Sequence, residues 1–146
     1  MGEMAYLIAN VSVVPVWLLL VFAPRARITE RMASTPLIPA LHAALYVALL
    51  VGSMAMGGGG DLSSLAGLRQ AFQSDTVLLL AWVHYLCFDM VVGMWLYRDA
   101  RRLGITWWAA GPCLVGTLMF GPAGFLGYAV ARRIMVGAVA WDKPAT

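Results

Sequence analysis

Residues 76–97, TVLLLAWVHYLCFDMVVGMWLY, decide the fold, because this long apolar run contains a single charged side chain, Asp89. At 1.5 Å per residue an α-helix of this length extends about 33 Å, which is enough to cross a hydrocarbon core of roughly 30 Å. The run ends at the charged cluster Arg98-Asp99-Ala100-Arg101-Arg102. The sequence therefore predicts a transmembrane helix that carries His84 and Asp89 at bilayer depth.

Three further apolar segments, at about 4–23, 36–56 and 107–131, are also long enough to cross a bilayer. The whole chain is 62% hydrophobic and only 12% charged, with a mean hydropathy of +0.80. A soluble domain normally carries about 25% charged residues. The sequence thus predicts an all-α fold with one domain over residues 1–146, an integral, multi-pass membrane bundle of four transmembrane helices.

The positive charges lie mostly in short clusters between the apolar runs, which is typical of helix ends at lipid headgroups rather than of nucleic-acid binding. The loops after the first and third spans hold six arginines, and the opposite side is expected to hold four basic residues. This difference favours cytoplasmic first and third loops, with both termini on the other side. The two groups are Arg25, Arg27, Arg31, Arg98, Arg101 and Arg102, against Arg69, Arg132, Arg133 and Lys143.

Two segments allow more than one interpretation. After the glycine run at residues 57–60, the side chains Leu62, Leu65, Leu68 and Phe72 recur at helical spacing, which fits an amphipathic surface helix or a loop that dips into the interface. The fourth span is rich in glycine and proline, which indicates tight helix packing or a bend that lines a cavity. Its glycine and proline residues are Gly111-Pro112, Gly116, Gly121-Pro122, Gly124 and Gly127.

Polar side chains at bilayer depth are costly, and a carboxylate there costs about 2.5–3.5 kcal/mol on insertion scales. Counting residues from the side of the first and third loops places His42 and Asp89 at roughly 9 and 12 Å, and Asn10 and His84 at roughly 20 Å. Such residues can stitch helices together by hydrogen bonds or can line a functional cavity. A metal site would need three or four convergent ligands, so we expect no metal. The sequence contains none of the common nucleotide, haem or metalloprotease motifs, so we expect no cofactor.

The run from Trp82 to Tyr97 resembles the HYLAFDLFVGRW-like signature of the abscisic-acid-deficient-four-like membrane proteins, whose plant members are neoxanthin synthases. Met94 departs from the polar or basic residue expected at its place in that signature. Downstream residues continue the likeness, namely Asp99, Gly104-Ile105, Pro112, Thr117 and Gly121-Pro122-Ala123-Gly124.

The resemblance implies an enzyme that acts on a carotenoid or related isoprenoid, in the manner of an isomerase that opens a xanthophyll epoxide to an allene. Such a reaction needs an acid at the epoxide oxygen and a base at a neighbouring proton. We expect the acid–base work to rest on four residues: His84, Asp89, His42 and Tyr85. The residues expected to bind substrate are Asn10, Tyr46, Trp82, Trp95, Thr117, Gly121 and Gly124.

Two other function classes stay open from the sequence. One is a carotenoid- or lipid-binding or assembly module without catalysis. The other is a small proton-coupled transporter that uses Asp89 as its membrane-embedded carboxylate. In every case the expected partners are the lipid bilayer and a hydrophobic small molecule, and a homodimer would help to enclose a long ligand.

Overall fold

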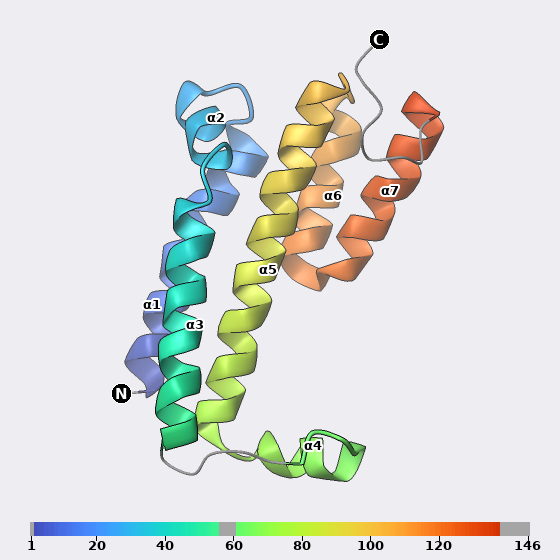
Figure 1. Ribbon diagram of the computed structural model, residues 1–146. Coiled ribbons are helices and arrows are strands. Elements are labelled where there is room, and N and C mark those ends of the chain that lie inside the picture. Colours follow the sequence, from blue (N-terminus) through green and yellow to red (C-terminus); the bar gives the residue numbers. More distant parts are fainter. Residues whose placement is uncertain (1, 56–60, 138–146) are drawn as a thin grey trace. The chain divides into compact units, whose positions relative to one another are not determined.

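The computed structural model describes residues 2–55 and 61–137, and this part of the chain folds into seven α-helices without a strand (Figure 1). The predicted all-α class is confirmed. In chain order the helices are α1 (Gly2–Phe22), α2 (Arg27–Ala33), α3 (Leu37–Ala55), α4 (Leu65–Ala71), α5 (Asp75–Arg102), α6 (Trp107–Phe120) and α7 (Pro122–Val136).

The chain forms two compact units, and α1 and α5 each contribute residues to both. Unit 1 contains Met1–Val13 and Leu37–Phe88, and unit 2 contains Val14–Pro36 and Asp89–Thr146. Each unit has its own buried apolar side chains, such as Val83 in unit 1 and Leu114 in unit 2, both of which are fully buried.

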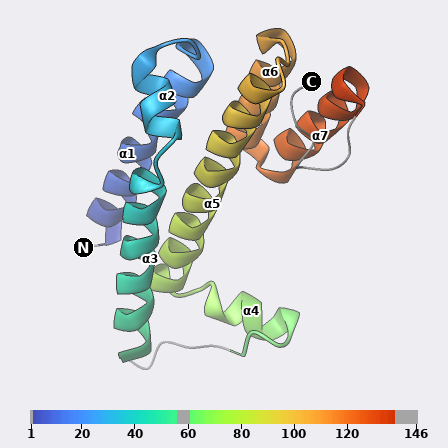
Figure 2. The ribbon, with the colours of Figure 1, turned by 45° about the horizontal axis from the view of Figure 1, so that its top comes forward.

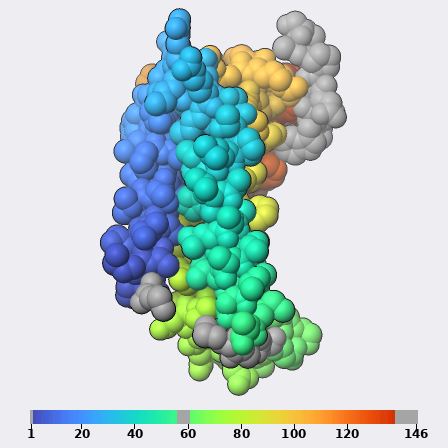
Figure 3. Space-filling view, turned by 60° about the vertical axis from the view of Figure 1, so that its left-hand side comes forward, coloured from blue at the N-terminus to red at the C-terminus, as the bar shows by residue number. Residues whose placement is uncertain are grey.

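Within unit 1, hydrogen bonds join the first turns of α1 and the N-terminal part of α5 to α3. The hydroxyl of Ser12 lies 3.0 Å from the His42 ring, and the Cys87 thiol donates to the carbonyl of Pro39 at 3.4 Å. Figure 3 shows the first residues of α1 beside α3 on the face that it views. The outer surface of this unit is apolar, with Leu41 61% and Ile8 59% exposed.

Among the residues that the structure describes, three helices are long and apolar enough to cross a membrane: α1, α3 and α5. They coincide with the predicted spans at 4–23, 36–56 and 76–97, although residue 56 lies outside the described residues. An apolar surface of this kind suits a lipid environment, because in water it would promote association.

The segment before α5 contains a short helix, α4. One of the two interpretations of residues 61–75 expected a helix there. The Ser64 hydroxyl caps α4 by accepting from the Gly67 amide at 3.0 Å. Hydrogen bonds from Ser63 hold the pKa of Asp61 below its ordinary value. Leu65 is 74% exposed, so the apolar side chains of this segment are available to an interface. The preceding glycine run at 57–60 lies outside the described residues.

The expectation of one continuous helix over 107–131 is wrong, because the chain reverses at Gly121 between α6 and α7. Gly121 has φ +44°, a backbone conformation that L side chains rarely adopt, and Pro122 follows it as the first residue of α7. At 1.5 Å per residue the two helices extend only about 21 and 22 Å, less than the hydrocarbon thickness. Figures 1 and 2 show them running in opposite directions from this turn.

The two helices of this helical hairpin touch backbone to backbone. A Cβ atom at Gly124 would overlap the main chain of Gly116 and Thr117, whereas one at Gly127 would make an ordinary contact of 3.6 Å with the Cys113 sulfur. At this crossing the glycines therefore serve tight packing, which is one of the two interpretations that the sequence left open.

The hairpin brings the end of α7 back to the end of α5. Arg132 in the last turns of α7 donates through Nε to Asp99 at 2.8 Å, and Arg101 of the same α5 end pairs with Glu30 of α2. Arg132 therefore lies with the loop basic residues, and the expectation that it lies on the opposite side is wrong. Lys143, which entered the same expectation, lies outside the described residues.

We predict that Gly124→Ala lowers the free energy of unfolding by about 2–3 kcal/mol, because the added methyl group must separate α6 from α7. Gly127→Ala is the matched control, since its methyl group finds ordinary space. Thermal unfolding of both variants in detergent checks the prediction, and equal stability of the two would contradict backbone contact at Gly124.

Candidate functional site

An aromatic cluster in unit 1 joins the starts of α1 and α5. The Tyr6 and Trp82 ring centroids lie 5.9 Å apart, and those of Trp82 and Tyr85 lie 5.5 Å apart. Asn10 orients this cluster, because its Oδ1 accepts from the Trp82 indole at 3.2 Å while its amide donates to the Tyr6 carbonyl at 2.7 Å. Three residues expected at the site, Asn10, Trp82 and Tyr85, are thus brought together.

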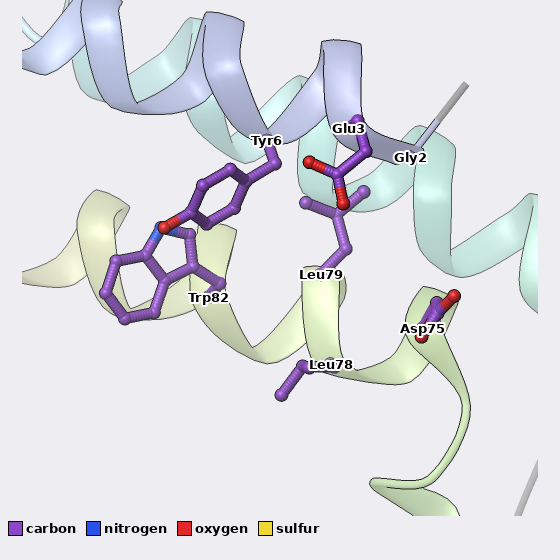
Figure 4. A pocket seen from close by; sticks show the side chains of 7 residues that line it. All are labelled: Gly2, Glu3, Tyr6, Asp75, Leu78, Leu79 and Trp82. Atoms are coloured by element: carbon purple, nitrogen blue, oxygen red, sulfur yellow. The ribbon is translucent and has the colours of Figure 1, made fainter.

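A cavity of about 530 Å³ opens beside this cluster, between the first turns of the two helices (Figure 4). Its walls combine aromatic rings, leucine side chains and two carboxyl groups, one from each helix. The lining residues are Gly2, Glu3, Tyr6, Asp75, Leu78, Leu79 and Trp82. Such a mixture of apolar walls and few polar groups is typical of small-molecule sites.

The sequence prediction missed Glu3 and Asp75, because acidic residues at helix starts are common for electrostatic reasons alone. Both stand in the first turn of an apolar helix. The signal that could have found them is their shared position, since two helices that start at the same membrane surface bring their first turns together.

His42, an expected catalytic residue, is 5% exposed and has hydrogen-bond partners at both ring nitrogens. Nδ1 lies 3.0 Å from the Ile38 carbonyl and Nε2 lies 3.0 Å from the Ser12 hydroxyl. Because a carbonyl can only accept, Nδ1 carries a proton, while the Ser12 hydroxyl beside Nε2 also bonds to the Ala9 carbonyl at 3.0 Å. These bonds favour a helix-joining role for His42.

His84, the second expected catalytic histidine, lies in an aromatic contact between α3 and α5. Its ring centroid is 5.6 Å from that of Tyr46 and 4.6 Å from that of Phe88. Unlike His42, His84 is exposed at the surface of the protein. Tyr46, expected to bind substrate, is thus placed beside an expected acid–base residue.

Asp89 belongs to unit 2 and lies against the turn of the helical hairpin. A Cβ atom at Gly121 would stand 2.8 Å from Asp89 Oδ1, and Oδ2 is buried from solvent. The turn is where α7 begins, so the positive end of that helix lies next to the carboxylate. Half-helices that begin at membrane depth commonly meet anionic groups in this way.

The other residues expected to bind substrate in unit 2 pack within the hairpin or against it. The Thr117 hydroxyl donates to the Cys113 carbonyl at 2.8 Å, and Trp95 packs edge-on against Tyr128 with centroids 5.7 Å apart. Gly124 meets the α6 backbone. Gly121 stands directly beside an expected catalytic group, the Asp89 carboxylate.

A buried ion cluster around Asp99 in unit 2 was not predicted as a site. Asp99 is 5% exposed, and its Oδ2 accepts from the Tyr128 hydroxyl and from Arg132 Nε, both at 2.8 Å. Its Oδ1 accepts from Arg102 at 2.7 Å. The sequence carries no signal for this cluster, because an Asp among arginines at a helix end is usually solvated.

The expected catalytic residues are divided between the units, since His42, His84 and Tyr85 belong to unit 1 and Asp89 to unit 2. A shared catalytic cavity for them therefore stays a prediction. Within the described ranges, 2–55 and 61–137, no three His, Cys, Asp or Glu side chains are grouped to hold a metal ion.

Comparison with known proteins identifies the relatives of this chain. It is 27% identical over 138 residues to "Protein ABA DEFICIENT 4, chloroplastic" of Arabidopsis thaliana. The matched stretch covers 89% of this chain and 61% of that relative's length. No solved structure matches the chain. The family described as ABA DEFICIENT 4-like matches residues 4–128, which include every residue named in this subsection except Gly2, Glu3 and Arg132. The chain belongs to the ABA DEFICIENT 4-like family.

Proposed function

We propose that this protein is a multi-pass membrane enzyme that acts on a carotenoid or related isoprenoid by acid–base chemistry. Family membership, the resemblance of residues 82–97 to the family signature, and three described helices long enough to cross a bilayer support the proposal. The relative named above is described as chloroplastic, and this chain spans about three-fifths of its length.

The position of Asp89 against the hairpin turn is the observation that carries the catalytic proposal. The glycine backbone at residue 121 leaves room for the carboxylate, and α7 begins directly beside it. An ionised carboxylate that is shielded from water is a competent base, because it loses little hydration when it takes up a proton.

In the proposed reaction Asp89 removes the proton from the vinylic carbon next to the epoxide. The electrons of that C–H bond form the second double bond of the allene, the epoxide C–O bond breaks, and an acid donates a proton to the oxygen. Atoms and electrons balance, so no redox partner is needed. His84, with Tyr85 one residue further along α5, is the proposed acid.

The unit 1 cavity is proposed to bind one ring of a carotenoid or related isoprenoid. Tyr6 and Trp82 offer flat apolar faces to an isoprenoid ring, and Glu3 and Asp75 can accept hydrogen bonds from a ring hydroxyl. This arrangement favours oxygenated over purely hydrocarbon ligands. A homodimer that encloses the remainder of a long polyene belongs to the same proposal.

A non-catalytic binding module is the second candidate function. The two hydrogen bonds at His42 favour it, because they leave that ring with a structural role and remove one of the expected proton carriers. It shares the unit 1 cavity with the enzymatic proposal and differs from it in yielding a bound pigment without a product. The transporter alternative is weaker, since the Asn10 side chain of α1 already bonds to Trp82 and Tyr6.

We predict that expression in a pigment-producing host changes its carotenoid composition and that Asp89→Asn abolishes this change while membrane insertion is retained. Loss of the base explains the effect, since an amide cannot take up the proton. Chromatography of extracted pigments measures it, and Asp61→Asn, an exposed site outside both cavities, is the control. Unchanged turnover in Asp89→Asn would remove Asp89 from the mechanism, and a co-purified pigment without product would establish the binding module.

We also predict that Glu3→Gln with Asp75→Asn reduces co-purification of hydroxylated carotenoids about fivefold relative to hydrocarbon carotenes. The reason is that a hydrogen bond to a charged acceptor is stronger than one to an amide. The absorption spectrum and the pigment ratio of the purified protein measure the effect. An unchanged ratio would show that the unit 1 cavity does not hold the oxygenated ring.

A further inference from the structure

A second cavity, of about 480 Å³, lies within unit 2 where the loop after α1 meets the end of α5 and the start of α6. Two arginines come from separate elements of this unit, Arg25 from the loop and Arg101 from the last turn of α5. Trp107 and Trp108 at the start of α6 contribute the aromatic side of the cavity, and Gly104 and Ile105 complete it.

Hydrogen bonds fix the walls of this cavity before any ligand binds. The Pro24 carbonyl accepts from the Tyr97 hydroxyl at 2.7 Å and from Arg101 Nη1 at 3.1 Å, which ties the loop to α5. The Trp107 indole donates to the Val21 carbonyl at 3.1 Å, which ties α6 to the end of α1. Because the site is preformed, few side chains have to become ordered when a ligand binds, so little conformational entropy is lost.

The electrostatics of the cavity favour an anion. Arg101 also pairs with Glu30, but two bonds use only part of the five N–H donors of a guanidinium. Arg25 is exposed and adds a second positive charge, and the described residues that line the cavity include no acidic side chain. Planar guanidinium groups match the geometry of phosphate oxygens.

Trp108 indicates that the anion is part of a lipid. Its side chain is 92% exposed, the largest value among the exposed large hydrophobic residues of the described chain. An exposed indole beside arginines at the end of an apolar helix is typical of the headgroup level of a membrane. A soluble phosphate compound would leave this ring without an apolar neighbour.

We propose that this cavity binds the phosphate of an anionic membrane lipid, with Arg25 and Arg101 on the phosphate and Trp108 against the glycerol and upper acyl region. The site shares no lining residue with the unit 1 cavity, and Asp89 is not part of it. Its test therefore does not depend on the carotenoid proposal.

The test measures binding of phosphatidylglycerol and phosphatidylcholine to the purified full-length protein in nonionic detergent, by native mass spectrometry. We expect saturable binding of phosphatidylglycerol in preference to phosphatidylcholine. Arg25→Gln should weaken the phosphatidylglycerol complex about fivefold. Arg69→Gln, which removes an equal charge from α4 in unit 1, should leave it unchanged, and Trp108→Ala should weaken lipid binding as well.

Three results would overturn the proposal. Equal binding of the two lipids would show that the negative charge of the lipid is not recognised. Equal weakening by Arg69→Gln would show that only the net charge of the protein matters. Displacement of the lipid by millimolar inorganic phosphate, with Trp108→Ala without effect, would assign the cavity to a soluble phosphate compound. Circular dichroism of Arg25→Gln is the folding control. Because Arg25 is exposed, we expect unchanged helix content, so that weaker lipid binding is not caused by unfolding.

Discussion

The buried contact of Asp99 with Arg132 and Tyr128 is the interaction on which the arrangement of unit 2 depends. It joins the last turn of α5 to the last turns of α7 and so holds the open end of the helical hairpin. Removing one partner of a buried ion pair typically costs about 3–5 kcal/mol, because the other charge stays desolvated. Arg102 completes the carboxylate's hydrogen bonding, which makes the pair tolerable at 5% exposure.

At the closed end of the hairpin a single glycine satisfies two requirements at once. Gly121 adopts a positive φ that ends α6, and its missing side chain leaves space for the Asp89 carboxylate. Gly124 then allows α6 and α7 to touch through their backbones. The fold of the last 30 residues of the described chain and the environment of the proposed base therefore share the same few glycines.

The sequence predicted the long apolar helices well, since hydropathy and length alone define them, and it predicted the contact among Trp82, Asn10 and Tyr85 only as a set of candidates. It missed the reversal at Gly121, because hydropathy counts apolar residues and does not register backbone dihedral angles. It missed Asp99, Glu3 and Asp75 because charged residues at helix ends are usually solvated. Whether His84 and Asp89 act together stays a prediction, since the two belong to different units.

The shortness of α6 and α7 makes the two helices depend on each other. A lone helix of about 21 Å would leave its far end, with unpaired main-chain groups, inside hydrocarbon. Neither helix is long enough to cross such a core alone, and the contact of Gly124 with the Gly116 backbone makes α6 and α7 a single packing element. A change that separates α6 from α7 should therefore also loosen the ion pair of Arg132 with Asp99, because α7 carries both contacts.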